Sequence, residues 1–122
     1  MKALHTLAAA AALAGAVLVA PLASAHAVLK SSAPQAGAVL AAAPRDITLT
    51  FNEKIEEAFS SITVTRGDGG AVTTGKAKPD SANPAVMHVE VPALTAGDYS
   101  VKWAVAGHDG HRRTGEFKFT VK

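Results

Sequence analysis

Three residues, His26 near the start of the chain and Asp109 and His111 near its end, have side chains that could bind one metal ion together. The last two belong to the segment Gly107-His108-Asp109-Gly110-His111. In an extended segment, residues two apart point to the same side, so Asp109 and His111 can converge on one point while His108 points elsewhere. An Asp-x-His pair alone is weak evidence for a metal site, so the interpretation depends on His26.

The first 25 residues have the three-part layout of a secretory signal peptide. Lys2 and His5 precede an apolar run at residues 7–20, which is followed by Pro21 and by small residues at 23–25. The run is shorter than the roughly 20 residues that a membrane-spanning helix needs. We therefore predict that residues 1–25 are a signal peptide, and that residues 26–122 form one domain in the periplasm or, in a single-membrane organism, at the cell exterior.

Cleavage after Ala25 would make His26 the first residue and give it an α-amine. The amine and the ring Nδ1 of an N-terminal histidine can bind a metal together in a six-membered chelate, which an internal histidine with a protonated amide cannot form. A rival cleavage after Ala27 also fits the small-x-small rule. It would remove His26, and the exported chain would then begin at Val28.

The expected ligands are an amine nitrogen, two imidazole nitrogens and one carboxylate oxygen. Nitrogen and oxygen donors in a tetragonal plane favour copper(II), which also has the highest affinity in the divalent series. Zinc would accept similar ligands but prefers a tetrahedral arrangement. Copper(I) prefers sulfur, but the chain has no Cys, and Met87, the one Met after Met1, falls on the core face of a predicted strand. We therefore predict a site for one copper(II) ion, Cu(II).

Three further side chains near or outside this set are weaker candidates. Glu53 follows a predicted strand, where it could bond the terminal amine or a metal-bound water, or simply be a solvated carboxylate. His88 alternates with core positions, so we expect its ring to face solvent and not to bind the metal. His108 is nearer to the site in the sequence, and we expect it not to be a ligand either.

Short runs with apolar residues at every second position must position these side chains, and Gly, Pro, Asn and Asp separate the runs. The segment Gly67–Gly70 is typical of a hairpin turn. The spacing of Leu94, Gly97 and Tyr99 is that of a tyrosine corner, in which the phenol bonds to backbone upstream. About seven strands, with no helix after the signal, predict an all-β, Greek-key immunoglobulin-like sandwich. The strands are expected near residues 28–32, 46–51, 62–64, 71–76, 87–91, 99–105 and 117–121.

Composition limits the classes of function. With 12 Lys or Arg, 10 Asp or Glu and a formal charge of +2, the chain has no clustered basic face for nucleic acid or anionic lipid. Neither a nucleophile elbow nor a phosphate loop is present in the sequence. We therefore expect a monomeric binding protein without stable membrane insertion, and not an enzyme.

After the signal, the chain resembles the CopC-type (CopC/PcoC) periplasmic copper-resistance proteins over essentially its whole length. The segments that carry the resemblance are His26-Ala-Val-Leu-Lys-Ser-Ser-Ala-Pro34, Leu49-Thr-Phe-Asn-Glu53, Leu94-Thr-Ala-Gly-Asp-Tyr99-Ser-Val-Lys-Trp103, Asp109-Gly-His111 and Gly115-Glu-Phe-Lys-Phe119. The resemblance implies a Greek-key sandwich that binds copper(II) through the amine and imidazole of His26 with Asp109 and His111. It implies that Glu53 lies near the copper, and that a membrane copper importer of the CopD type is a partner in copper buffering or delivery.

The chain departs from that family at one place. Some members carry a Met-rich stretch that binds copper(I), whereas residues 63–74 of this chain contain no Met. We therefore expect a single copper(II) site. Two other functions stay open, namely a small copper enzyme like the lytic polysaccharide monooxygenases, which also use an N-terminal histidine chelate, and a metal-free immunoglobulin-like interaction module.

Overall fold

Alternating apolar and polar residues form strands through most of residues 27–122, the part of the chain described by the computed structural model. In β3 (Asp46–Phe51), for example, Ile47, Leu49 and Phe51 are buried while the residues between them are exposed or half-buried. The predicted signal peptide and His26 lie outside the described residues. The other elements are β1 (Leu29–Ala33), β2 (Val39–Leu40), the 3-10 helix η2 (Glu57–Phe59), β4 (Ser61–Arg66), β5 (Ala71–Val72), β6 (Lys78–Pro79), β7 (Val86–Glu90), β8 (Gly97–Ala106) and β9 (Arg112–Val121).

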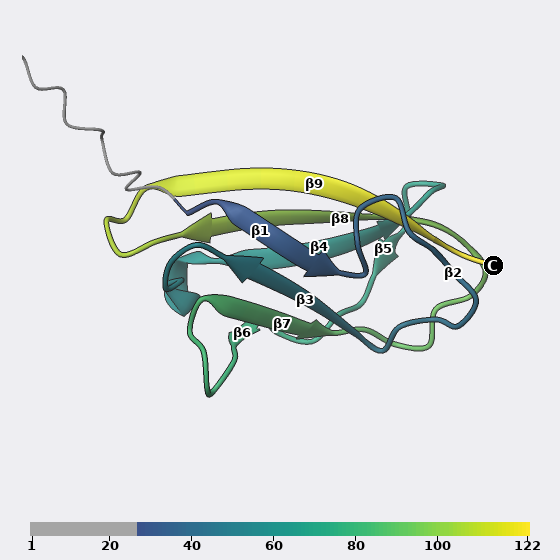
Figure 1. The fold of residues 1–122 in the computed structure, drawn as a ribbon. Coiled ribbons are helices and arrows are strands. Elements are labelled where there is room, and N and C mark those ends of the chain that lie inside the picture. The colour runs from purple at the N-terminus through teal and green to yellow at the C-terminus, as the bar shows by residue number, and fades with distance from the viewer. Residues whose placement is uncertain (1–26) are drawn as a thin grey trace, which may run out of the picture.

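The strands form two sheets that pack face to face (Figure 1). One sheet has the strand order β1-β3-β7-β6, and the other has the order β2-β9-β8-β4-β5. Paired strands are antiparallel except for β2 and β9, which are parallel. The prediction of an all-β sandwich is therefore confirmed.

The described residues contain nine strands, whereas the sequence predicted about seven. The two additional strands, β2 and β6, have two residues each. A two-residue strand is too short to show alternation, and each is defined by its pairing with a longer neighbour, β9 or β7. The predicted strand near 71–76 is also shorter than expected, because β5 ends at Val72.

The core lies between the sheets and consists of side chains from the alternating positions. Trp103 is half-buried, and its ring meets Phe51 edge-on, with ring centroids 5.3 Å apart and an interplanar angle of 77°. Gly115 lies opposite Trp103 on β9, and a Cβ atom at Gly115 would overlap the indole. The most deeply buried large side chains are Phe51, Phe119, Ile47, Leu49, Ile55, Met87, Val64, Val89, Val101 and Val105.

Tyr99 forms the tyrosine corner that the sequence predicts. Its hydroxyl donates a hydrogen bond of 2.7 Å to the carbonyl oxygen of Thr95, four residues upstream. Its ring is buried and stacks on Phe119, with centroids 5.4 Å apart. This contact ties the loop before β8 to the core and fixes where β8 begins.

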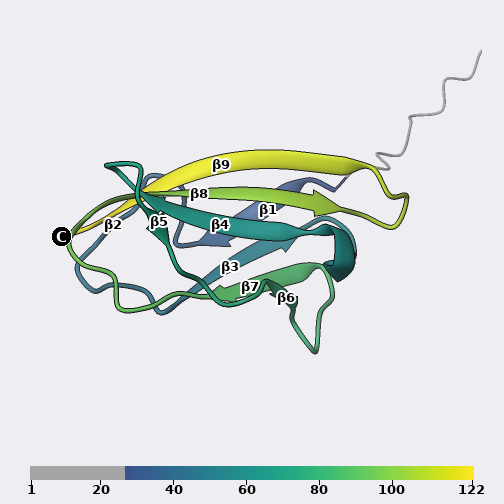
Figure 2. The same ribbon diagram turned by 180° about the vertical axis from the view of Figure 1, so that it is seen from behind.

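Both β3 and β8 end at the same end of the sandwich, where β9 begins (Figure 2). An isolated bridge between Ile55 and Gly107 joins the residues that follow the two strands. The fold thus brings the segment after β3 against the turn that contains Asp109 and His111.

None of the helices among residues 27–122 is long and apolar enough to cross a membrane.

Tyr99→Phe is predicted to lower the free energy of unfolding by about 1 kcal/mol, because the Thr95 carbonyl loses its buried donor. Thr95→Ala is the matched control, since it keeps the backbone acceptor and should change stability by less than about 0.5 kcal/mol. Urea unfolding of both variants measures the difference. Equal stability of Tyr99→Phe and the wild type would contradict a structural role for this hydrogen bond.

Candidate metal centre

The turn between β8 and β9 carries two of the predicted metal ligands. Residues 107–111 connect Ala106, the end of β8, to Arg112, the start of β9. The N–H of Gly110 donates to the carbonyl oxygen of Gly107 over 2.9 Å, and Gly110 has φ +81°. A residue with a side chain rarely adopts this left-handed conformation, so glycine allows the turn to close.

Asp109 and His111 point toward one another, as predicted. One carboxylate oxygen of Asp109, Oδ1, accepts the backbone N–H of His111 at 3.0 Å, and the other, Oδ2, lies 3.4 Å from the ring Nδ1 of His111. The physical reason differs from the expected one, because the two residues lie in a turn closed by the aspartate side chain and not in an extended segment. A carboxylate oxygen and an imidazole thus converge on one side of the turn.

Glu53 connects the end of β3 to this turn. Its Oε1 accepts the backbone N–H of His108 at 3.3 Å, and its carboxylate lies directly over Gly107. Gly107 is buried, and a Cβ atom at that position would overlap the Glu53 carboxyl group. Sequence reasoning identified Glu53 but missed this contact. The sequence feature that could have revealed the contact is Gly107, the glycine that directly follows the long strand pattern at residues 99–106.

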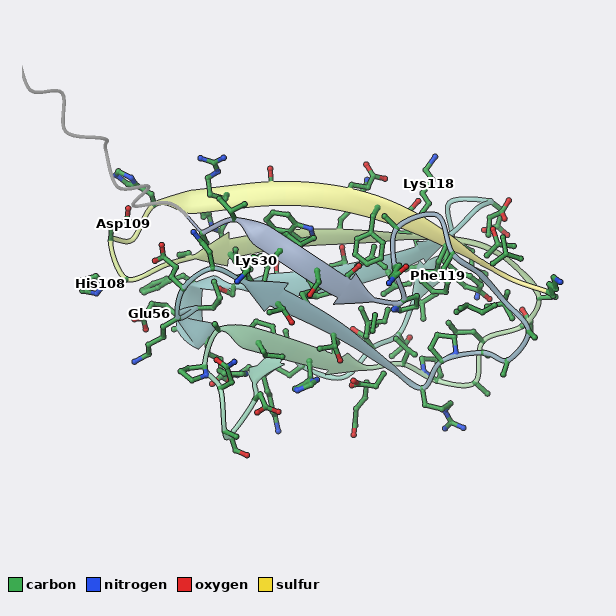
Figure 3. The ribbon with its side chains drawn as sticks, viewed as in Figure 1. Lys30, Glu56, His108, Asp109, Lys118 and Phe119 are labelled. Carbon is green, nitrogen blue, oxygen red and sulfur yellow. The ribbon has the colours of Figure 1, made fainter. Side chains whose placement is uncertain are left out.

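The start of the described chain is held beside Glu53. Asn52 and Val28 exchange two hydrogen bonds: the Val28 N–H donates to the Asn52 Oδ1 over 2.7 Å, and the Asn52 N–H donates to the Val28 carbonyl oxygen over 3.0 Å. Ala27 is buried, with an exposed fraction of 1%. Residues 27 and 28 therefore lie next to the segment that reaches the Asp109 turn, and Figure 3 shows Asp109 and His108 at this end of the sandwich.

His26, the third predicted ligand, lies outside the described residues, and so does the cleavage site after Ala25. Its role stays a prediction. Among residues 27–122, no three His, Cys, Asp or Glu side chains cluster closely enough to hold a metal ion.

The other two histidines have different surroundings. His108 is exposed and contributes its backbone N–H to Glu53. His88 lies opposite Thr48 in the middle of β3, away from the turn. The expectation that the His88 ring faces solvent is only partly correct, because two aspartates contact it and one third of the side chain is exposed.

Comparisons with known proteins show the family of the domain. A family model described as CopC domain matches residues 29–122. The crystal structure of CopC from Methylosinus trichosporium OB3b is 34% identical, with a TM-score of 0.75 over 80% of this chain and 94% of that chain. PcoC, a methionine-rich copper resistance protein from Escherichia coli, is 36% identical, with a TM-score of 0.73 over 80% of this chain and 100% of that chain. Copper transport protein CutJ of Bacillus subtilis is 32% identical over 98 residues, which are 80% of this chain and 18% of that protein.

The fold and these comparisons define a β-sandwich of the copper-resistance type. The chain belongs to the CopC domain family. The predicted Greek-key fold and family are thereby confirmed, and the family connects the chain to copper binding and copper homeostasis.

Gly107→Ala is predicted to lower the free energy of unfolding by about 1 kcal/mol, because the added methyl displaces the end of the Glu53 side chain and breaks its hydrogen bond to the turn. Gly75→Ala is the matched control. A Cβ at Gly75 also meets a glutamate, Glu90, but at an ordinary contact distance of 3.6 Å. Thermal unfolding of both variants tests this, and equal losses of stability would contradict the contact between Glu53 and the turn.

Proposed function

We propose that the exported protein binds one copper(II) ion through the amine and imidazole of His26 together with Asp109 and His111. The observation that carries the proposal is the convergence of Asp109 Oδ2 and His111 Nδ1, 3.4 Å apart, in a turn that is joined to the chain start. Monomeric protein of this kind would buffer copper in the periplasm or at the cell exterior, or deliver it to another protein. It would not turn over a substrate.

The hydrogen bonds around Asn52 and Glu53 support a ligand from the chain start. Asn52 binds Val28, and its neighbour Glu53 binds the turn at His108. Residue 26 is two peptide units from Val28, and consecutive Cα atoms are about 3.8 Å apart. An N-terminal chelate at His26 would therefore have to reach only a short distance to share an ion with the Asp109 turn.

The carboxylate of Glu53 is suited to act beside the ligands. It is half-buried and already accepts one backbone N–H from the turn. A carboxylate in this place would accept a hydrogen bond from the terminal amine or from a water bound to copper, and so orient the group for binding. It would also offset part of the positive charge of the ion.

The donor set supports the oxidised ion. Nitrogen and oxygen donors match copper(II), whereas copper(I) prefers sulfur. The chain has no Cys, and Met87 is fully buried in the core. The relative PcoC is described as methionine-rich, and this chain lacks such a sulfur supply. A carboxylate ligand would further stabilise copper(II) over copper(I), which disfavours redox cycling.

A membrane copper importer of the CopD type is the partner that we propose. CutJ, a copper transport protein, contains a matching segment that makes up 18% of its length. In CutJ, a protein named for copper transport, the segment similar to this domain is therefore part of a much longer chain. The domain described here would present its copper to such a partner at the end of the sandwich that carries the Asp109 turn.

One residue added before His26 is predicted to lower the copper(II) affinity by at least about tenfold, because the amine is no longer part of the histidine chelate. The same residue added after Lys122 is the control and should have no effect. Competition with a chelator of known affinity measures both variants. Undiminished affinity in the N-terminal variant would remove the chelate from the proposal.

Copper(II) affinity is predicted to fall steadily from about pH 8 to about pH 5, because imidazole and amine ligands must lose protons before they bind a metal. His88→Gln should show the same dependence as the wild type, since His88 is not a ligand. Chelator competition over this range provides the test. An affinity that does not vary with pH would contradict nitrogen ligation.

A further inference from the structure

The imidazole of His88 lies between two carboxylates that come from different parts of one sheet. Its Nε2 is 2.8 Å from the Asp80 Oδ1, and its Nδ1 is 3.3 Å from the Asp46 Oδ2. A neutral imidazole has one N–H donor, whereas an imidazolium has two. Only the protonated ring can therefore donate to both aspartates at once. Because both ring nitrogens face carboxylates, this cluster favours a bound proton over a bound metal.

Asp80 connects His88 to the turn between β6 and β7. Its second oxygen, Oδ2, accepts the backbone N–H groups of Ala82 at 2.9 Å and Asn83 at 3.1 Å. The aspartate thus closes the turn with one oxygen and binds His88 with the other. The contact attaches the turn to the outer face of the sheet.

The strand next to this turn has few other attachments. Strand β6 is at the edge of its sheet and contains Lys78 and Pro79 only. They lie opposite His88 and Met87, and proline has no N–H to donate. Further backbone bonds run from the Asp80 N–H to the Val86 carbonyl oxygen over 2.7 Å and from the Val86 N–H to the Asn83 carbonyl oxygen over 3.0 Å. The His88 contact adds a side-chain attachment to this small set of backbone bonds.

The charges around His88 balance when the ring is protonated. Three carboxylates and two ammonium groups surround the ring, so an imidazolium brings the formal charge of the cluster to zero, while a neutral ring leaves it at −1. The charged residues that line this pocket with His88 are Asp46, Lys76, Lys78, Asp80 and Glu90.

The hydrogen bond to Asp80 raises the pKa of His88, partial burial lowers it by a smaller amount, and the bond to Asp46 raises it further. The same imidazole lowers the pKa of Asp80 through the shared hydrogen bond. The geometry and the directions of both pKa shifts favour the protonated ring over the neutral one.

Thr48 gives the cluster a second hydrogen-bonding arrangement. Its Oγ1 is 3.0 Å from the Asp46 Oδ2 and 3.0 Å from the His88 Nδ1. While Nδ1 carries a proton, the hydroxyl can donate only to Asp46. When Nδ1 loses its proton, the hydroxyl can turn and donate to the ring, and Asp46 then loses both donors.

We propose that His88 is a proton-dependent latch, which holds β6 and the turn at residues 80–83 against the sheet while the ring is charged and loosens them when it is neutral. A folded-state pKa above the unfolded value means that this stabilisation is fully present below about pH 6.5 and is lost as the pH rises through the folded pKa. Loosening would uncover the backbone edge of β7, which is a surface that can pair with another strand.

Hydrogen exchange of backbone amides tests the latch on the whole exported domain without copper. The protection factors of the Ala82 and Asn83 amides are expected to fall about fivefold between about pH 5.5 and about pH 9, since the contact with the Asp80 carboxylate loses the positive charge of its donor. The Gly70 amide is the internal control. It donates to the Asp68 Oδ1 in a similar turn over 2.8 Å, and its protection factor should stay constant. Constant protection at Ala82 and Asn83 would overturn the proposal.

Variants and an NMR titration of the His88 ring complete the test. In His88→Gln, protection of the turn should be low at every pH, because no charge can be gained. Asp80→Asn should lower the His88 pKa more than Asp46→Asn, since the Asp80 contact is the shorter one. Glu116→Gln, on the other sheet, should leave the titration unchanged. A wild-type ring that titrates at or below about 6.5, or an Asp80→Asn variant with an unchanged titration, would overturn the proposal.

Discussion

The hydrogen bonds from the segment after β3 hold three distant parts of the chain together at one end of the sandwich. Asn52 binds the chain start at Val28, and Glu53 binds the β8–β9 turn at His108. The chain start and the segment after β3 flank two strands that pair with each other, β1 and β3, whereas the turn joins β8 to β9 in the other sheet. No one hairpin could therefore build the site. Besides Glu53, the bridge between Ile55 and Gly107 holds the turn against the segment after β3.

Glycine makes this arrangement sterically possible at two positions of the turn. Gly107 leaves room for the Glu53 carboxylate, and Gly110 adopts φ +81° so that the turn can close. The turn then places the Asp109 carboxylate against both the backbone and the ring of His111. Strands β8 and β9 fix the two ends of the turn, while Asp109 and His111 belong to the turn itself, where backbone conformation is not restricted by a sheet.

Sequence patterns predicted the parts of the fold that depend on alternation. The long strands, the tyrosine corner at Tyr99 and the pairing of Asp109 with His111 all follow from residue types within a few positions of each other. Strands β2 and β6 could not be predicted, because two residues carry no period. The contacts of Glu53 with His108 and of His88 with Asp46 join residues that are 55 and 42 positions apart, and such pairs become neighbours only when the sheets are assembled.

The β3 strand connects the two places for which we propose a response to protons. It begins at Asp46, beside the imidazole of His88, and it leads at its other end into Glu53. Under these proposals protons would stabilise the His88 cluster, whereas they would compete with copper for nitrogen ligands at the other end. There, we propose, export creates the missing ligand. Native intact mass of the exported protein, recorded with and without one equivalent of copper(II), tests this claim directly. The account predicts a chain that begins at His26 and gains the mass of one copper ion. A chain that begins at Val28, or one that begins at His26 and takes up no copper, would contradict it.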